Sequence, residues 1–209
     1  MPDAKVLSTR ARLLASGAAV FAEKGYEGGS TREICQRADT SINMVHHYFG
    51  TKANLLEAII DQFGVQVLAL PMKLLATPPK SRDDFISRIE LLFHATLEAC
   101  LEHRPLLMVV VREQAAPPAL GEYIENFTRF LTEGKHRGFV RKGLDTTMIT
   151  GAIIDRIISQ VLHRPSIEGV YGIDMSDPKY LMHWCTSNVD LYVHGMVPAT
   201  DLEAKDNLT

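Results

Sequence analysis

The chain has 209 residues, of which 46% are hydrophobic and 22% are charged, with a formal net charge of -3. A chain of this size can bury a sizeable core in one large domain or in two smaller ones. The overall charge gives no sign of a nucleic-acid partner, but residues 1–60 hold seven Lys or Arg against six Asp or Glu. This small excess permits a basic face at the N-terminal end.

Three features argue against a secreted or membrane-spanning protein. Cys35, Cys100 and Cys185 are far apart and form no CxxC motif, which is typical of reduced, buried thiols. The first residues are charged and lack a long apolar run, so no signal peptide is expected. We see no stretch that approaches the roughly 20 uncharged apolar residues of a membrane span. The sequence therefore predicts a cytoplasmic protein.

Helical periodicity dominates the N-terminal part. Apolar residues at i, i+4 and i+7 predict a helix over 9–24, and Gly25 is expected to end it. Ser30 and Glu33 then form a capping box, in which the Ser30 hydroxyl bonds the Glu33 amide and the Glu33 carboxylate bonds back. A short helix is expected to follow, with Ile34 facing inward.

A polar turn, Asp39-Thr40-Ser41, interrupts this segment because the side-chain oxygens compete for backbone amides. A second short helix is expected from about 41 to 47. Gly50 ends it, and Thr51 caps the next helix. Two short helices joined by a three-residue turn are the outline of a helix-turn-helix unit.

Helical patterns continue beyond this unit. Pro71 and the TPPKS segment at 77–81 predict a boundary. Further helices are expected over 82–104, through the PLLMVVV segment that begins at Pro105, and over 119–137, 146–163 and 177–196. A Pro- and Gly-containing loop is expected at 165–176.

The N-terminal part resembles the DNA-binding domain of the TetR family of bacterial transcriptional regulators. The matching residues are Phe21, Gly25-Tyr26, Ser30 through Ile34, Ala38, His47 through Lys52, and Leu55-Leu56. The resemblance implies an all-α fold of about nine helices. It also implies a flexible N-terminal arm at 1–8, a three-helix helix-turn-helix domain with a linking helix at 9–65, and a ligand-binding and dimerisation domain at 66–209.

The resemblance further implies a homodimer that binds double-stranded operator DNA. Carried over by position, the phosphate contacts are Thr31, Tyr48 and Lys52, and the remaining groove-facing or flanking candidates are Arg32, Ser41, Ile42, Asn43, Met44, His46 and His47. Physical chemistry agrees, because helix N-termini attract phosphate groups. An asparagine can also bond an adenine edge with both amide atoms.

The adjacent His46 and His47 allow other interpretations. Neighbouring side chains point about 100° apart on a helix and no Cys, Asp or Glu lies at ligand spacing, which argues against a metal site. A catalytic pair would need a nucleophile and an orienting group, and neither is evident. A solvated helix end without a role is the third alternative.

Two sets of residues are candidates for sites in the C-terminal part. The ligand-pocket candidates are Phe93, Leu97, Met108, Phe127, Phe130 and Trp184, each of which at helical spacing is more often plain core. The dimer-interface candidates are Ile154, Ile158, Leu162, Leu181, Cys185, Val189 and Tyr192, on helices with broad apolar faces. His183 and His194 could share a helix face, but the sequence assigns them no role.

The sequence thus predicts a dimeric regulator, a repressor by resemblance, that a largely apolar small molecule releases from its operator. Two other classes are considered: an all-helical enzyme or small-molecule carrier whose N-terminal helices do not bind DNA, and a helical adaptor that binds another protein. No acid-base pair, metal cluster or phosphate loop supports the enzyme, so neither catalysis nor a cofactor is expected. No membrane partner is expected.

Overall fold

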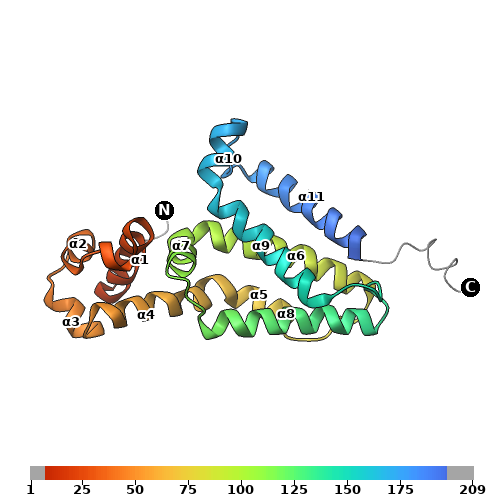
Figure 1. Ribbon diagram of the computed structural model, residues 1–209, viewed down its shortest axis with the longest axis horizontal. Coiled ribbons are helices and arrows are strands. Elements are labelled where there is room, and N and C mark those ends of the chain that lie inside the picture. Colours follow the sequence, from red (N-terminus) through yellow and green to blue (C-terminus); the bar gives the residue numbers. More distant parts are fainter. Residues whose placement is uncertain (1–7, 197–209) are drawn as a thin grey trace, which may run out of the picture. The chain divides into compact units, whose positions relative to one another are not determined.

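The computed structural model describes residues 8–196, and every regular element in that range is a helix (Figure 1). The elements are α1 (Thr9–Gly28), α2 (Thr31–Arg37), α3 (Asn43–Phe49), α4 (Lys52–Phe63), the π-helical segment η1 (Gly64–Leu68), α5 (Ala69–Leu75), α6 (Arg82–Glu102), α7 (Arg104–Arg112), α8 (Pro118–His136), α9 (Thr146–Leu162), α10 (Arg164–Tyr171) and α11 (Pro178–Met196). The predicted all-α class is therefore confirmed. Most of the expected N-terminal arm, 1–8, lies outside the described residues.

The chain divides into two compact units. The first unit comprises the chain up to Val67 together with His103–Leu120, and the second comprises Leu68–Glu102 together with the chain from Gly121. This division differs from the predicted domains at 9–65 and 66–209, because α7 packs with α1 and α4 in the first unit. Such a distant pairing leaves no local pattern in the sequence.

Buried apolar residues of α1 form much of the core of the first unit. Leu13, Val20 and Phe21 are fully buried. Gly25 has a positive φ of 75°, as expected for a residue that ends a helical run, and one further turn continues to Gly28. A side chain at position 25 would also approach Arg112 Nε to 3.1 Å. Both backbone conformation and space therefore favour glycine here.

Two predicted helix caps are present. The Ser30 hydroxyl accepts a hydrogen bond from the Glu33 amide, and the Thr51 hydroxyl accepts one from the Asn54 amide. The second half of the capping box was wrong, because the Glu33 carboxylate bonds the side chains of Lys24 and Arg37. Charge-assisted bonds to two cations compete successfully with one backbone amide.

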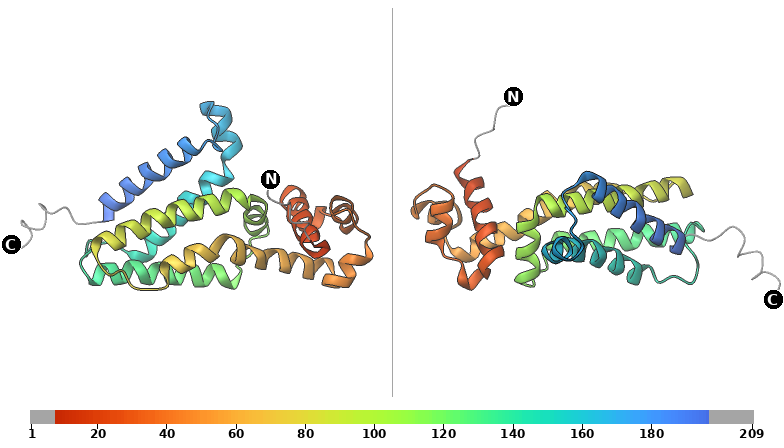
Figure 2. Two further views of the ribbon diagram at one scale, coloured as in Figure 1. Left: turned by 180° about the vertical axis from the view of Figure 1, so that it is seen from behind. Right: turned by 90° about the horizontal axis from the view of Figure 1, so that it is seen from above.

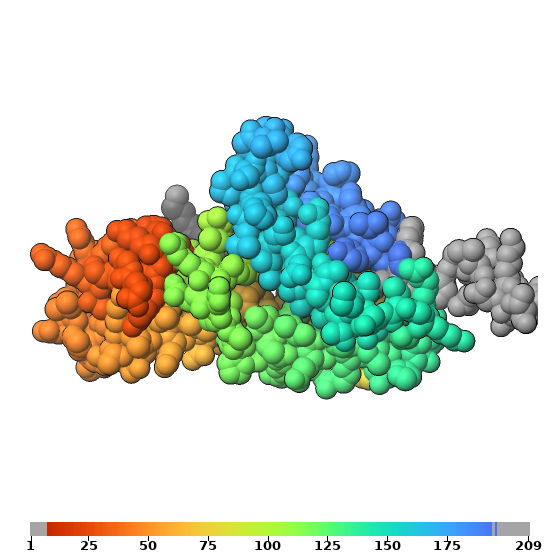
Figure 3. Space-filling view, viewed as in Figure 1, coloured from red at the N-terminus to blue at the C-terminus, as the bar shows by residue number. Residues whose placement is uncertain are grey.

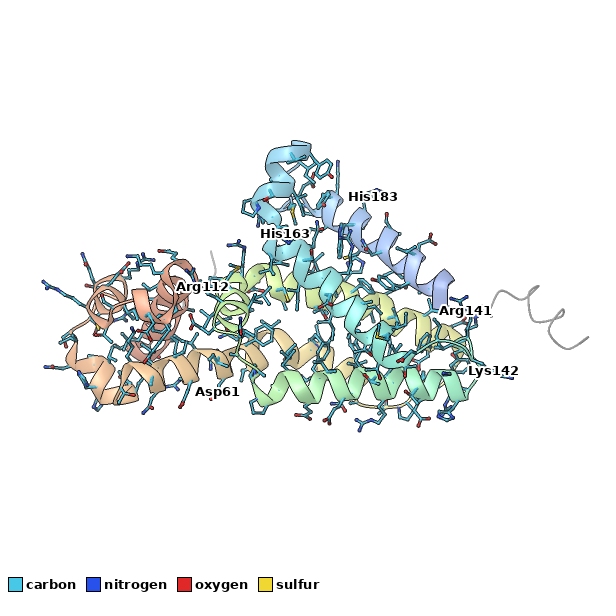
Figure 4. The ribbon with its side chains drawn as sticks, viewed as in Figure 1. Asp61, Arg112, Arg141, Lys142, His163 and His183 are labelled. Atoms are coloured by element: carbon cyan, nitrogen blue, oxygen red, sulfur yellow. The ribbon has the colours of Figure 1, made fainter. Side chains whose placement is uncertain are left out.

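Helix α7 is fixed to α1 by polar contacts as well as by apolar packing. The Arg112 guanidinium donates to the carbonyl oxygens of Ala22 and Glu23, at 3.1 and 3.0 Å (Figure 4). The Glu113 carboxylate accepts from the Tyr26 amide at 2.8 Å. These bonds satisfy backbone groups that the break at Gly25 would otherwise leave unpaired.

Pro71 does not interrupt the helical run of residues 52–75, and the division between the two units falls within that run, between Val67 and Leu68. Pro71 lies within the first turn of α5, directly after η1, whose hydrogen bonds span five residues instead of four. This run is the one helix in the described residues that is long and apolar enough to span a membrane. Packing explains its apolar side: Leu55, Ile59 and Phe63 are buried in the first unit.

Helix α6 lies at the centre of the second unit, with α5, α9 and α11 packed against it (Figure 2). Its buried Phe85 stacks on Phe130 of α8, with ring centroids 5.3 Å apart. Arg88 donates to the backbone carbonyls of Leu74, Thr77 and Pro78, which holds the TPPKS loop against α6.

Helix α10 occupies much of the segment predicted as a loop at 165–176, so that prediction was wrong. Pro165 lies in its first turn, where the missing amide costs nothing, and Gly172 ends it with a φ of 63°. Val170 and Tyr171 are 76% and 72% exposed. This helix stands out from the second unit in the space-filling view (Figure 3).

Candidate nucleic-acid interface

Helices α2 and α3 and the turn between them form the helix-turn-helix, with their inner sides in the core of the first unit. Ile34 of α2 and Val45 of α3 are almost completely buried. Asp39 in the turn has a positive φ of 48°, a conformation that aspartate tolerates. The Arg12 Nε donates to the Ala38 carbonyl at 3.0 Å, which ties α1 to the end of α2.

The candidate DNA-contacting residues of the turn and α3 lie at the surface. Ser41, Ile42, Asn43, His46, His47 and Tyr48 are exposed, and Met44 is half-buried. Val45 and Phe49 are buried and face the core. This seven-residue helix therefore buries two side chains and presents Asn43, His46, His47 and Tyr48 to solvent. In α2, Arg32 is exposed and Thr31 is half-buried.

The junction between α3 and α4 is held in one conformation by side-chain hydrogen bonds. Gly50 has a φ of 75° and ends α3. The Asn54 amide group donates to the Phe49 carbonyl at 2.9 Å, and the Asn54 backbone amide donates to Thr51. The His46 ring bonds the Gly50 carbonyl through Nδ1 at 2.9 Å. Tyr48, Thr51 and Lys52 are thus presented on a fixed turn.

Lys52, in the first turn of α4, is positioned by two aromatic rings of α1. Its Nζ atom lies 4.3 Å from the centroid of the Tyr26 ring and 5.9 Å from that of Phe21. A cation–π contact of this kind holds an ammonium without using its hydrogen-bond donors. The charge therefore lies beside the N-terminus of α4, where a phosphate is favoured.

The sequence reasoning missed three residues that support this surface. Arg10 of α1 is exposed, and its guanidinium lies 5.4 Å from the centroid of the Phe49 ring. Tyr26 holds Lys52, and Asn54 joins the two helices. Of these three residues, only Asn54 could have been identified from the neighbouring sequence, because it stands three residues after a capping threonine.

An ion-pair network borders the helix-turn-helix between α1 and α2. Arg37 bonds Glu23 and Glu33, and Glu33 also bonds Lys24. The hydrogen bond from Arg37 lowers the pKa of Glu23, and the hydrogen bond from Lys24, with Arg37, lowers the pKa of Glu33. These charges are paired within the protein, whereas Arg10 and Arg32 have no carboxylate partner among its described ion pairs.

The ligand-pocket candidates are distributed over both units. Five of them, Phe93, Leu97, Phe127, Phe130 and Trp184, are buried in the second unit, and Met108 belongs to α7 in the first. A groove of ≈ 630 Å³ lies elsewhere, between α6 and α11, and includes Leu91, His94 and Val193. The predicted set contributes no residue to that groove.

The dimer-interface candidates differ in accessibility. Cys185 and Val189 are buried inside the second unit itself. The others, Ile154, Ile158, Leu162, Leu181 and Tyr192, are half-buried and leave part of their surface open. His183 is exposed on α11 (Figure 4), and the side chain of His194 lies outside the described residues.

Comparison with known proteins agrees with this geometry. The family described as "Bacterial regulatory proteins, tetR family" matches residues 13–59. A relative, the HTH-type transcriptional repressor KstR2 of Mycobacterium tuberculosis, is 26% identical over 162 residues, which cover 72% of this chain and 78% of the relative.

Solved structures share the fold over most of the chain. The ketosteroid transcriptional regulator KstR2 of Mycobacterium tuberculosis matches with a TM-score of 0.70 and 19% identity, over 93% of this chain and 98% of that one. The regulator FadR of Bacillus subtilis, solved in complex with stearoyl-CoA, matches with a TM-score of 0.68 and 18% identity, over 88% and 97%.

The helix-turn-helix buries the inner side chains of both its helices and exposes its second helix, and a helical bundle follows in the chain. Together with the family match, these features define a DNA-binding transcriptional regulator. The matches in sequence agree with this class. Residues 13–59 match the tetR family of bacterial regulatory proteins, and a relative that aligns over 72% of this chain is a transcriptional repressor.

Proposed function

We propose that this protein is a homodimeric repressor that a small, largely apolar molecule releases from operator DNA. The DNA-binding part of this proposal rests on one observation, the fixed junction between α3 and α4. It presents exposed Asn43, His46 and His47 beside Tyr48 and the cation of Lys52. On a double helix, the histidines and Asn43 would contact base edges, and Tyr48 and Lys52 would contact phosphates.

The contacts are divided by their chemistry. Thr31, Arg32, Tyr48 and Lys52 bind phosphates and fix the position of the protein on the duplex. Ser41, Ile42, Asn43, Met44, His46 and His47 face the major groove, which distinguishes all four base pairs. The paired network of Arg37, Glu23 and Glu33 keeps its own charges occupied and stays outside the contact surface.

The effector site is assigned to the second unit. Its interior is rich in aromatic side chains, including Phe93, Phe127 and Trp184, which suit an apolar ligand. The names of similar proteins support such a ligand, since one is a ketosteroid transcriptional regulator and another was solved with stearoyl-CoA.

Dimerisation supplies the second DNA-binding unit. The half-buried apolar residues of α9 and α11, such as Ile154, Ile158 and Leu181, retain surface for a partner copy. Two helix-turn-helix units would then contact half-sites about 34–36 Å apart. An effector that prefers a dimer with a different spacing depopulates the DNA-binding form.

The DNA-binding role is tested by mobility shift on the DNA that flanks the gene, with Lys52→Ala and with Lys142→Ala as a matched exposed lysine of the second unit. Lys52→Ala should weaken binding about tenfold and lower the salt slope by about one, because one phosphate contact is lost. Tyr48→Phe should weaken it less, since the ring is retained. Lys142→Ala should bind as wild type.

The opposite result favours a different class of protein. If wild type and Lys52→Ala bound equally, with no dependence on salt, the N-terminal helices would serve only for packing. An all-helical carrier or enzyme, or an adaptor for another protein, would then be the better interpretation.

A further inference from the structure

The His46 ring makes one hydrogen bond whose direction is fixed by its partner. Nδ1 of His46 lies 2.9 Å from the backbone carbonyl oxygen of Gly50, four residues later. A carbonyl oxygen only accepts hydrogen bonds, so the nitrogen must donate. Nδ1 of His46 therefore carries a proton in this conformation.

This proton determines the chemistry of the other ring nitrogen. A neutral imidazole has one N–H group, and the nitrogen without it is an acceptor. When the ring is neutral, Nε2 of His46 is thus a hydrogen-bond acceptor with no proton to donate. An unconstrained histidine could adopt either tautomer, but the carbonyl of Gly50 selects one of them.

His46 is also available to a partner molecule. Val45 and Phe49 direct one side of α3 into the core, and His46 follows Val45 by about 100° around the helix. The residue is exposed, and its ring is held by the bond to the end of α3. A held ring loses little freedom when it binds.

We propose that His46 is a specificity-determining residue that recognises an exocyclic amino group, adenine N6 or cytosine N4, in the major groove. The inference rests on the proposed DNA-binding function and adds the chemical class of base that this position selects. Both amino groups donate hydrogen bonds to an acceptor such as Nε2.

The same geometry disfavours the other two bases. Guanine presents the acceptors N7 and O6, and thymine presents O4 and a methyl group. Each would place an acceptor or an apolar group against the lone pair of Nε2 and leave that nitrogen without a partner. A neutral, Nδ1-protonated His46 thus selects adenine or cytosine, because its Nε2 can accept a hydrogen bond from an amino group but cannot donate one to an acceptor.

The test uses variants that distinguish two roles of His46: the hydrogen bond from Nδ1 to Gly50 and the hydrogen bond that Nε2 accepts from the base. In His46→Asn, the side-chain amide can still donate to Gly50, because it lies near the place of Nδ1, but no atom replaces Nε2. In His46→Arg, only donors are present. His183→Asn, at an exposed histidine of the second unit, is the matched control.

Selection from a randomised DNA library at pH 8, where histidine rings are mostly neutral, is the first measurement. Wild type should enrich adenine or cytosine at one position of each half-site. His46→Asn should lose that preference and keep the rest of the site, and His46→Arg should change it to guanine. His183→Asn should leave the whole selected sequence unchanged.

The second measurement removes the amino group from the DNA. The selected adenine is replaced by purine, or the selected cytosine by pyrimidin-2-one, and each leaves a base without the exocyclic donor. Wild type should lose about fivefold in affinity, as expected for one hydrogen bond, and His46→Asn should lose nothing.

Three outcomes would count against the inference. Selection of guanine or thymine by wild type at the position sensitive to residue 46 would overturn it. An unchanged preference in His46→Asn, or a uniform loss of affinity with a lower melting temperature, would show that the bond to Gly50 serves only to end α3. In each of these cases DNA binding persists, whereas a wild type that binds no DNA would overturn the proposed function as well.

Discussion

The contact between Lys52 and Tyr26 determines where one charge of the first unit lies. The two residues are 26 positions apart, yet the ammonium is 4.3 Å from the ring centroid. The exposed residues of α3 could be predicted from the sequence because the alternation of buried Val45 and Phe49 with polar residues is local. The partner of Lys52 could not, because it depends on how α4 packs against α1.

Replacing the Tyr26 ring should therefore affect DNA binding at a distance from the groove. Tyr26→Leu should weaken operator binding about threefold, because an aliphatic side chain provides no π face for the ammonium. Tyr26→Phe keeps the ring and should bind within error of wild type. Mobility shifts measure both, and circular dichroism shows whether the fold is retained. Equal losses in the two variants would show that the ring does not position Lys52.

At the scale of single elements, α2 depends on its surroundings for stability. Seven residues are too few for an isolated helix, so the Ser30 cap and the ion pairs to Lys24 and Arg37 matter more than intrinsic propensity. The cap could be predicted from a four-residue motif. The ion pairs to α1 could not, and neither could α10, since Pro165 at a helix start and a proline in a loop look alike in sequence.

The ion pairs of α2 should make the first unit sensitive to acid. Lys24 and Arg37 lower the pKa of Glu33 below its ordinary value, so the pairing stabilises the fold at neutral pH and is lost as pH falls through the lowered pKa. Glu33→Gln should lower the melting temperature at pH 7 and make little difference near pH 3. Glu27→Gln, on the same exposed stretch, is the control. A deficit that persists at low pH would point to packing.

The two compact units of the whole molecule each bury at least one thiol. Cys35 lies in the first unit, and Cys100 and Cys185 lie in the second; all three are free and buried. Burial raises the pKa of all three thiols, that of Cys100 to about 12 and that of Cys185 to about 11. That the cysteines are reduced and buried could be predicted from their spacing. The placement of α7 with α1 could not.

Thiol labelling should therefore report the opening of each unit separately. In single-cysteine variants at pH 8, Cys35 and Cys100 should react with a disulfide reagent only as their units open, with different rates, because a buried thiol forms little thiolate. The dependence of each rate on urea measures the opening. Immediate reaction of all three thiols in the native protein would contradict the burial described above.

The π turn at Gly64–Leu68 affects how this chain tolerates changes in length. Its hydrogen bonds span five residues instead of four, so the turn holds one residue more than an α-helical turn would. Loss of a single residue there, such as the exposed Gln66, could convert it to an ordinary turn without rotating the apolar stripe of α4 out of the first unit or that of α5 out of the second. Elsewhere in the same helical run, one deletion would turn everything beyond it by about 100°. Homologous chains that differ by one residue in this helix are thus expected to differ at this turn.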